Sequence, residues 1–326
     1  MYKKILILFI FLLLTACSSL NNESNNIEIE TYEPIMEGYS VSYSIDATTQ
    51  KTSDDFKSKN LLYVPENEVL KISYGNKNVQ NKESKVIMKV FYDYKQIDFK
   101  LTDADNYFSE YKFDLESGKK IDISIRLDNN FMIFDNNMHK ILVAFTTGSE
   151  QNASDFNSVT DEYGINTIYD VVHNLDYTDH MIPYSFDYLL PENNYEKEYT
   201  NLSFNTDYNN TTQNSEFGGV LKPAPSLTVK RGSDFPLMYN LNKSGSENVL
   251  LLFTLNFEQV NLNNKYAELI KLDGKTGTAN GTINLKIPET PGKYEAIGYV
   301  IHNPYSDLSG KSNLFYSSYR FTFIVE

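Results

Sequence analysis

The stretch Lys120-Ile-Asp-Ile-Ser-Ile-Arg-Leu127 alternates polar and aliphatic side chains without a break. Successive side chains of a β-strand point to opposite faces, so one face of this segment is wholly aliphatic and the other is wholly polar. Such a pattern is typical of a strand in a sheet that is packed on one side only. The stretch therefore favours an all-β fold.

The same alternation continues on both sides of this stretch. Strands do not alternate with helical segments, which argues against a doubly wound enzyme. The composition agrees, because 25 Tyr and 20 Phe suit a pleated, half-buried surface. The segments that we expect to form strands are 38–45, 69–74, 85–92, 96–101, 107–115, 140–146, 226–229, 235–240, 249–256, 259–262, 266–272, 281–287, 293–302 and 314–325.

The two halves of the chain contain a repeat. Val86-Ile-Met-Lys-Val-Phe-Tyr-Asp-Tyr-Lys-Gln-Ile-Asp-Phe99 aligns without a gap with Val249-Leu-Leu-Leu-Phe-Thr-Leu-Asn-Phe-Glu-Gln-Val-Asn-Leu262. Asp93 then matches Asn256 at a turn, and Gln96 matches Gln259. A duplicated domain explains the shared turn chemistry better than chance similarity between strands does.

The segment Pro288-Glu-Thr-Pro-Gly-Lys-Tyr294 resembles the corner of immunoglobulin-like β-sandwiches, where a Tyr opens strand F and its hydroxyl bonds back across the turn. Ala296 stands where such domains often carry a Cys, so the inter-sheet disulfide is absent. The corresponding segment of the first half is Asn137-Met-His-Lys-Ile141, which has neither the Pro-Gly nor the Tyr. The resemblance implies two immunoglobulin-like sandwiches in tandem.

The N-terminus reads as an export signal, with Lys3 and Lys4 before an apolar run. Leu14-Thr15-Ala16-Cys17 resembles the lipobox of bacterial lipoproteins, which implies a diacylglyceryl group on the Cys17 thiol and cleavage before it. An ordinary signal peptide or a short membrane anchor is the alternative. The apolar run is about half of the ~20 residues that span a bilayer, which argues against the anchor.

The expected domain organisation follows from these features. We predict a signal peptide at 1–16, a flexible lipid-anchored tether at 17–37, a first sandwich at 38–204, a linker at 205–225 and a second sandwich at 226–326. The first sandwich would contain a long insertion near 149–198. The linker is assigned because 205–225 gathers Asn, Thr, Gly and Pro with hardly any apolar pattern.

Charge limits the possible partners. The whole chain carries a net charge of −14, and loss of Lys3 and Lys4 with the signal peptide takes it to −16. Phosphate backbones repel so acidic a chain, so nucleic acid is not expected as a partner. The expected location is the outer face of the bacterial cytoplasmic membrane, or the outer membrane of a Gram-negative cell, with the acyl chains as the anchor.

One cluster of side chains could hold a metal ion. Asp170, His173, Asp176, Asp179 and His180 combine imidazole and carboxylate, which suits Zn²⁺. On a helix, His173, Asp176 and His180 would share a face. The alternative is a solvated acidic loop with two incidental His, and we expect neither a cofactor nor a metal.

Aromatic side chains suggest a binding surface. Tyr184, Tyr188 and Tyr195 lie in the expected insertion, where exposed Tyr would make adaptable contacts with a protein or a glycan. They could equally fill the core of a further strand. Trp is absent, which counts against a carbohydrate-binding module, although Tyr can replace Trp. The interpretation is a non-enzymatic binding, adhesion or spacer protein, with an inhibitor or accessory subunit of a secreted or membrane enzyme, or a metal-dependent hydrolase, as alternatives.

The lipobox resemblance makes a direct prediction. Cys17→Ala removes the thiol that would carry the lipid, so the variant should not be acylated and its precursor should stay unprocessed or be misdirected. Metabolic labelling with a palmitate analogue measures this. Label that persists on the Cys17→Ala protein would contradict a lipid anchor at this residue.

Overall fold

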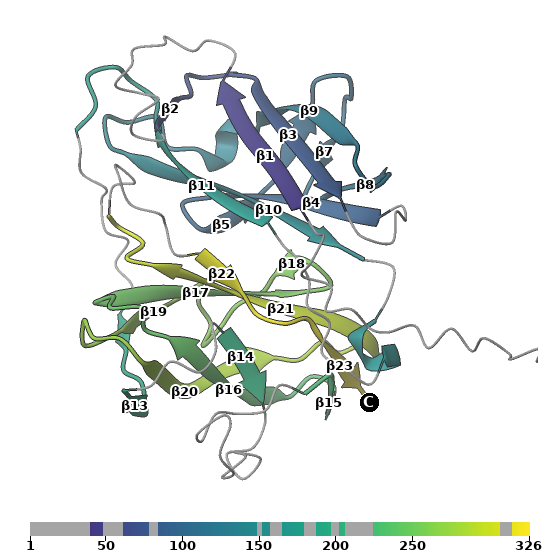
Figure 1. Ribbon diagram of the computed structural model, residues 1–326, viewed down its shortest axis with the longest axis vertical. Helices are drawn as coiled ribbons and strands as arrows, with labels where there is room; N and C mark the ends of the chain where they lie inside the picture. The colour runs from purple at the N-terminus through teal and green to yellow at the C-terminus, as the bar shows by residue number, and fades with distance from the viewer. Residues whose placement is uncertain are drawn as a thin grey trace, which may run out of the picture. The chain divides into compact units, whose positions relative to one another are not determined.

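Strands dominate the computed structural model (Figure 1). The structure describes residues 40–47, 61–77, 84–148, 152–156, 165–178, 187–196, 202–205, 224–306 and 315–326. Leu14, Thr15, Ala16, Cys17 and the tether lie outside these ranges, so the anchor stays a prediction. Within them, no helix is long and apolar enough to cross a membrane.

The first sandwich consists of two sheets. Outer sheet 1 has the order β1 (Ser40–Ala47), β3 (Leu70–Lys77), β9 (Lys120–Leu127), β6 (Phe99–Leu101) and β7 (Tyr107–Phe108). Inner sheet 1 has the order β2 (Leu61–Tyr63), β11 (Ile165–Val172), β10 (His139–Thr147), β4 (Ser84–Tyr92) and β5 (Lys95–Ile97), with β8 (Tyr111–Leu115) also paired to β4. A single 3-10 turn, η1 (Asn129–Phe131), lies between β9 and β10.

The second sandwich repeats this arrangement. Inner sheet 2 has the order β12 (Tyr188–Leu189), β19 (Glu268–Lys271), β17 (Asn248–Leu255), β21 (Gly292–His302), β23 (Phe321–Val325) and β15 (Ser226–Val229). β18 (Glu258–Gln259) pairs with β17, and β22 (Phe315–Ser317) pairs with β21. Outer sheet 2 has the order β13 (Asn193–Tyr195), β20 (Thr278–Lys286), β16 (Asp234–Asn242) and β14 (Leu202–Asn205).

The predicted tandem of immunoglobulin-like sandwiches is confirmed. In each sandwich a short early strand runs parallel to the last strand, as β2 does beside β11 and β15 beside β23. Each has its own core of aliphatic and aromatic side chains between its sheets. In the first core the rings of Tyr74 and Phe145 stack with centroids 4.2 Å apart, so packing joins the two sheets there.

The internal repeat is also confirmed. The hairpins β4–β5 and β17–β18 keep the same register, since Phe91 faces Gln96 and Thr254 faces Gln259. Both turn through two residues with positive φ, 47° and 69° at Asp93 and Tyr94, and 46° and 69° at Asn256 and Phe257. Two consecutive residues of this kind form the type I′ turn that suits the twist of a hairpin.

The predicted domain boundary needs correction. β12, β13 and β14 fall inside the expected first domain of 38–204, yet all three pair with strands of the second sandwich. β14 pairs with β16 as β1 pairs with β3, so β14 is the first strand of the second sandwich. The segment 205–225 therefore connects β14 to β15 within one sandwich instead of joining two domains. The expected insertion at 149–198 likewise contains β11, the last strand of the first sandwich.

Two predicted strands are divided between sheets. The segment 96–101 forms β5 in inner sheet 1 and β6 in outer sheet 1, and 107–115 forms β7 and β8 in the same two sheets. Ile97 and Phe99 are both buried in the core of the sandwich, on either side of the crossing at Asp98. Alternation continues through the crossing, so periodicity could not reveal it.

The two inner sheets pack face to face (Figure 1). Strand β4 is buried on both sides: Val86, Met88 and Val90 face the first core, whereas Ile87 and Phe91 face the second sandwich. One apolar cluster contains residues of both inner sheets, namely Ile87, Phe91, Tyr94, Leu142, Ala144, Ile168, Leu250, Leu252, Phe257, Ala267, Leu269, Ile297, Tyr299 and Ile301. Residues 40–326 consequently form one compact unit.

Equivalent residues of the two repeats bind each other at this interface. The backbone N–H of Gln96 donates to Gln259 Oε1 at 2.6 Å, and the backbone N–H of Gln259 donates to Gln96 Oε1 at 2.7 Å. These reciprocal bonds relate the sandwiches by a local pseudo-two-fold axis, as in an isologous dimer interface.

Two further hydrogen bonds join the sandwiches. In each, a side chain of β10 or β21 binds the segment that follows the equivalent strand of the other sandwich. Lys140, on β10, donates from Nζ to the carbonyl of Ser306 at 2.7 Å, and Glu295, on β21, accepts at Oε2 from the N–H of Ala153 at 3.2 Å. The two positions are equivalent, because Ile141 faces Tyr92 as Ala296 faces Leu255. At these equivalent positions, the Lys140 ammonium donates to a carbonyl and the Glu295 carboxylate accepts from an N–H, so the two bonds have opposite charge and opposite direction.

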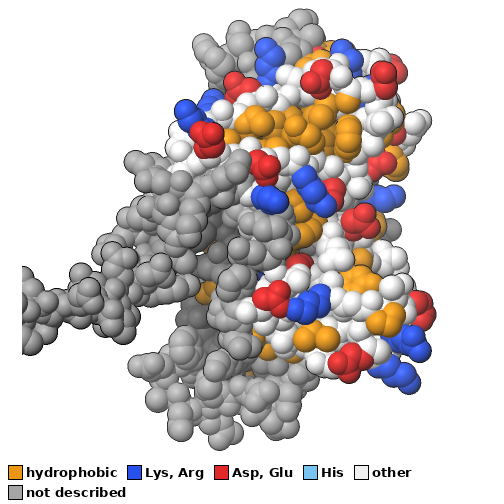
Figure 2. Space-filling model, turned by 90° about the vertical axis from the view of Figure 1, so that its right-hand side faces the viewer, with side chains coloured by type: hydrophobic (Ala, Val, Ile, Leu, Met, Phe, Trp, Pro, Cys, Tyr) orange, Lys and Arg blue, Asp and Glu red, His pale blue; other side chains and the backbone are white. Residues whose placement is uncertain are grey.

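Surface charge is mixed on the face shown in Figure 2. Lys and Arg side chains are interspersed with Asp and Glu side chains, and a band of hydrophobic side chains lies over the first sandwich. The net charge of −14 is thus not a uniform acidic field on this face.

The corrected boundary predicts the effect of Phe204→Ala. The Phe204 ring packs on Phe253 and Phe321, and a Cβ at Gly298 would lie 2.4 Å from it. Its removal should lower the free energy of unfolding of the full chain by about 3–5 kcal/mol, because it leaves a cavity in the second core.

Denaturant unfolding measures this change, with the exposed Phe131→Ala as the control that should stay close to the parent. If Phe204→Ala unfolds like the parent, then β14 does not belong to the second core.

Candidate functional site

The first sandwich has a polar cluster at the end of β10. The imidazole of His139 lies between two carboxylates, with Nδ1 2.6 Å from Asp93 Oδ2 and Nε2 3.0 Å from Asp135 Oδ1. His139 stacks on Tyr92 with ring centroids 5.2 Å apart. The Tyr92 hydroxyl lies 2.8 Å from His173 Nε2, and His173 Nδ1 lies 2.6 Å from the carbonyl of Val64.

The repeat explains why His139 lies here. The register makes His139 equivalent to Tyr294, and Asp135 equivalent to Thr290. In the second sandwich the hydroxyl of Tyr294 donates to the carbonyl of Thr290 at 2.9 Å, so the tyrosine corner expected from the sequence is present. In the first sandwich His139 Nε2 also bonds to the residue four positions earlier, but its partner is the side-chain carboxylate of Asp135 instead of a backbone carbonyl. The first sandwich therefore has a histidine corner.

The turn residue changes together with the corner residue. Asp93 accepts at Oδ1 from the N–H of Lys140 at 2.9 Å, and Asn256 accepts from the N–H of Glu295 at the same distance. This bond to the backbone is common to both sandwiches. Only the first sandwich has a second carboxylate oxygen at this position, and that oxygen binds His139. A neutral Tyr–Asn arrangement in one sandwich thus corresponds to a His–Asp pair in the other.

The two histidines of the cluster have opposite pKa shifts. Burial alone would lower the pKa of His139, but the hydrogen bond and charge of Asp93, followed by those of Asp135, raise it above the ordinary value. Burial lowers the pKa of His173, and its bond to the Val64 carbonyl only partly opposes this shift. The environment therefore favours the charged form of His139 beside Asp93 and the neutral form of His173.

These contacts occupy both nitrogen atoms of each imidazole. A general base needs a free lone pair within reach of a substrate proton. Nδ1 and Nε2 of His139 face carboxylates, while those of His173 face a carbonyl and a tyrosine hydroxyl. The cluster is therefore organised to hold the chain in place.

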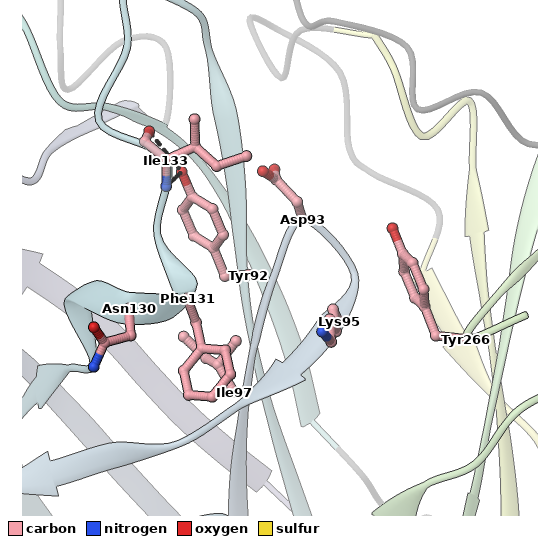
Figure 3. A pocket seen from close by; sticks show the side chains of 8 residues that line it. All are labelled: Tyr92, Asp93, Lys95, Ile97, Asn130, Phe131, Ile133 and Tyr266. Atoms are coloured by element: carbon pink, nitrogen blue, oxygen red, sulfur yellow. Dashed lines mark hydrogen bonds between the residues drawn. The ribbon is translucent and has the colours of Figure 1, made fainter.

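A pocket of about 200 Å³ opens beside the cluster (Figure 3). We call it the corner pocket; its lining residues are Tyr92, Asp93, Lys95, Ile97, Asn130, Phe131, Ile133 and Tyr266. Tyr266 comes from the second sandwich and lies across from Asp93 (Figure 3). The Tyr92 hydroxyl donates to His173 Nε2 and accepts from the N–H of Ile133 at 3.3 Å. The wall formed by residues 130–133 is thereby tied to the core.

Exposed hydrophobic side chains surround this end of the sandwich. Phe131, Ile133, Phe134 and Leu175, which we call the apolar rim, keep 41%, 49%, 38% and 45% of their surfaces exposed. Their two loops are bonded together, because Asn174 Nδ2 donates to the Asp135 carbonyl at 2.9 Å and the N–H of Thr178 donates to Asn136 at 2.7 Å. The Phe134 ring also lies 4.8 Å from that of His173. The rim is thus exposed yet fixed.

The second sandwich has a pocket at the equivalent place. Its volume is about 430 Å³, and its lining includes Leu255, Asn256, Glu258 and Val260. These four positions match Tyr92, Asp93, Lys95 and Ile97 of the corner pocket in the repeat. Glu258 replaces Lys95, so duplication preserved the hollow and changed its charge.

The predicted metal-binding residues are not brought together. Asp170 forms a buried ion pair with Lys140, and His173 belongs to the corner cluster instead. Asp176 is exposed in a turn after β11, so the helix that would align His173 with Asp176 does not form. Asp179 and His180 lie outside the described residues. Within the ranges that the structure covers, no three His, Cys, Asp or Glu side chains are grouped to hold a metal ion.

The predicted tyrosine surface lies on the second sandwich. Tyr188 is exposed on β12 with Lys271 Nζ 5.6 Å from its ring centroid, and Tyr195 is exposed on β13. Tyr184 lies outside the described residues. The cluster around His139 was not predicted from the sequence, although an alignment of His139 with Tyr294 was possible once the corner had been identified.

The opposite pKa shifts predict the pH dependence of two variants. The raised pKa of His139 contributes stability that is complete below the ordinary histidine pKa and is lost as pH rises through the folded value. His139→Gln leaves Asp93 buried without its cation, so it should destabilise by about 3–5 kcal/mol in mild acid and by less in mild alkali. Denaturant unfolding at several pH values gives this difference.

His173→Gln is the matched control. The lowered pKa of His173 makes the parent less stable as pH falls below the ordinary histidine pKa, because the unfolded chain then binds a proton that the folded chain does not. His173→Gln removes this loss, so its cost should decrease toward mild acid, the opposite trend to that of His139→Gln. A cost of His139→Gln that does not vary with pH would contradict a charged His139.

Comparisons with known proteins leave the family open. No protein-family model matches the chain, and no curated protein does. Among solved structures, the periplasmic chaperone SfaE matches with 10% identity and a TM-score of 0.23, covering 87% of this chain and 100% of that one. The C-terminal domain of the BspA polypeptide of Streptococcus agalactiae matches with 8% identity and a TM-score of 0.22, covering 87% and 100%. Alpha-2-macroglobulin of E. coli matches with 10% identity and a TM-score of 0.22, and only 16% of its chain is covered. At these TM-scores the similarities carry no argument about function.

Proposed function

We propose that this chain is a non-enzymatic binding protein of the bacterial cell surface, held by a lipid on Cys17, whose contact surface is the apolar rim of the first sandwich. The observation that carries the proposal is the exposure of four large hydrophobic side chains on two loops that are bonded to each other. Exposed apolar groups that cluster around a pocket mark interaction sites more often than scattered ones do.

The rigidity of the rim supports binding. Residues that are already ordered lose little conformational entropy when a partner binds, so more of the contact energy appears as affinity. Tyr92 fixes Ile133 by accepting from its N–H, and Asn174 fixes the neighbouring loop. Burial of such side chains contributes about 1.5–3 kcal/mol each.

The expected partner is a protein. Phe and Leu side chains around a shallow pocket suit the hydrophobic centre of a protein interface, and Asp93 and Lys95 in the pocket supply polar groups that can fix orientation. The packing of the inner sheets makes 40–326 one compact unit, so the rim is presented on a stiff support.

Affinity capture tests the proposal with the acylated full-length protein as bait on native membranes. The double variant Ile133→Asp/Leu175→Asp places two charges in the rim, and recovery of the partner should fall at least tenfold. The control Leu190→Asp alters another exposed leucine, on the second sandwich, and should recover the partner normally.

Circular dichroism melts show whether the variants keep the fold. Equal recovery by the double variant and the parent would refute the rim as the contact surface, whereas a loss confined to the double variant supports it.

A further inference from the structure

A second pocket, of about 300 Å³, lies on the solvent side of outer sheet 1. We call it the face pocket; its lining residues are Asn67, Lys100, Tyr107, Arg126, Leu127, Asp128, Asn129 and Asn130. Lys100 faces Tyr107 across β6 and β7 and faces Arg126 across β6 and β9. Cross-strand partners share a face of the sheet, so these three side chains form a row.

The row carries positive charge that the chain does not neutralise locally. Among the described residues, Arg126 forms no ion pair, and Lys100 has only Asp105 at 3.7 Å, a fully exposed partner. Asp128 also lines the pocket, but its Oδ1 accepts from the N–H of Asn130 at 2.9 Å and from Asn130 Nδ2 at 2.8 Å. The pocket lining thus has two cations and one carboxylate, whose Oδ1 is engaged, while Asp105 reaches Lys100 only from solvent, so the lining itself favours an anionic group.

The pocket also offers an acceptor without a donor. Asn129 Nδ2 donates to Glu66 and Asn67, at 3.3 Å and 3.2 Å, which orients the amide. Its Oδ1 is buried and has no hydrogen-bond partner in the described structure. A buried acceptor is costly when it stays unpaired, so a turn of the Asn129 amide that brings Oδ1 to a donor on a ligand gains affinity.

The combination of groups limits the ligand class. A sulfate ion would pair with Arg126 and Lys100 but brings no donor for Asn129, whereas a hydrogen phosphate ion brings a donor but no ring face to cover Tyr107. A carboxylated sugar brings both groups, since its carboxylate can pair with the cations and its hydroxyls can donate. The ring of Tyr107, which is 53% exposed, offers a flat apolar surface for the sugar ring.

We propose that the face pocket binds a uronic acid unit of an acidic saccharide. Arg126 and Lys100 pair with its carboxylate, Asn129 Oδ1 accepts from a ring hydroxyl, and Tyr107 packs against the face of the sugar. The site adjoins the corner pocket at Asn130, which lines both pockets, but it contains no residue of the apolar rim, and the variants below leave the rim residues unchanged.

Titration calorimetry at low ionic strength tests the proposal with two probes, a galacturonate hexasaccharide and a hyaluronan hexasaccharide. At least one should bind the full-length protein, and the fully methyl-esterified galacturonate hexasaccharide should not, because esterification removes the charge and keeps the rings. Arg126→Gln and Tyr107→Ser should each weaken binding about tenfold or more. Arg231→Gln makes the same charge change on an exposed arginine of the second sandwich and should bind like the parent.

Arg126 and Tyr107 are exposed, so both variants should melt like the parent. Failure of both acidic probes to bind, equal binding of the methyl ester, or full binding by Arg126→Gln would each overturn the proposal. The Ile133→Asp/Leu175→Asp protein should still bind the probe, which separates this site from the rim.

Discussion

The packing of inner sheet 1 on inner sheet 2 is the constraint on which the rest of the structure depends. Each inner sheet has an apolar face that points away from the core of its own sandwich. Ile87 and Phe91 belong to this face in the first sandwich, and Leu250 and Ile297 belong to it in the second. Without the contact, water would cover both faces. Burial of that face favours association of the halves. The reciprocal bonds of Gln96 and Gln259 satisfy backbone N–H groups at the same place, so the contact also has a defined register.

Because the two sandwiches are related by pseudo-symmetry, the positions at which their equivalent residues differ are informative. Both sandwiches keep the turn, the bond from the turn to the next strand, the corner and the hollow beside it. They differ where Asp93 and His139 replace Asn256 and Tyr294, and where Lys95 replaces Glu258. The exchange places charge on one corner only. The corner of the first sandwich holds an imidazole between two carboxylates, which raise the pKa of His139, so this corner responds to pH.

Much of the fold could be predicted from the sequence, because period-two alternation and an ungapped repeat are local signals. The prediction of strand 120–127 and the alignment of 86–99 with 249–262 needed no tertiary information. Residues 202–205 were assigned to the wrong sandwich, because four residues carry too little pattern to show which sheet they join. The candidate site was harder to predict from the sequence than the fold. Asp170 and His173 lie three residues apart, but they point to opposite sides of inner sheet 1 and bind different partners.

The sequence did contain a sign of the interface between the sandwiches. A strand with one solvent face alternates, as 120–127 does, whereas Val249-Leu-Leu-Leu-Phe253 is apolar at five positions in succession. Such a run is typical of a strand that is covered on both faces. The equivalent stretch Val86-Ile-Met88 is also continuous, so both repeats required a cover for the same face. Two equivalent apolar faces in one chain can bury each other by packing together, and the two inner sheets do so. Duplication of one sandwich whose inner sheet has an apolar exposed face provides two such faces in one chain, and a pseudo-two-fold contact between them covers both.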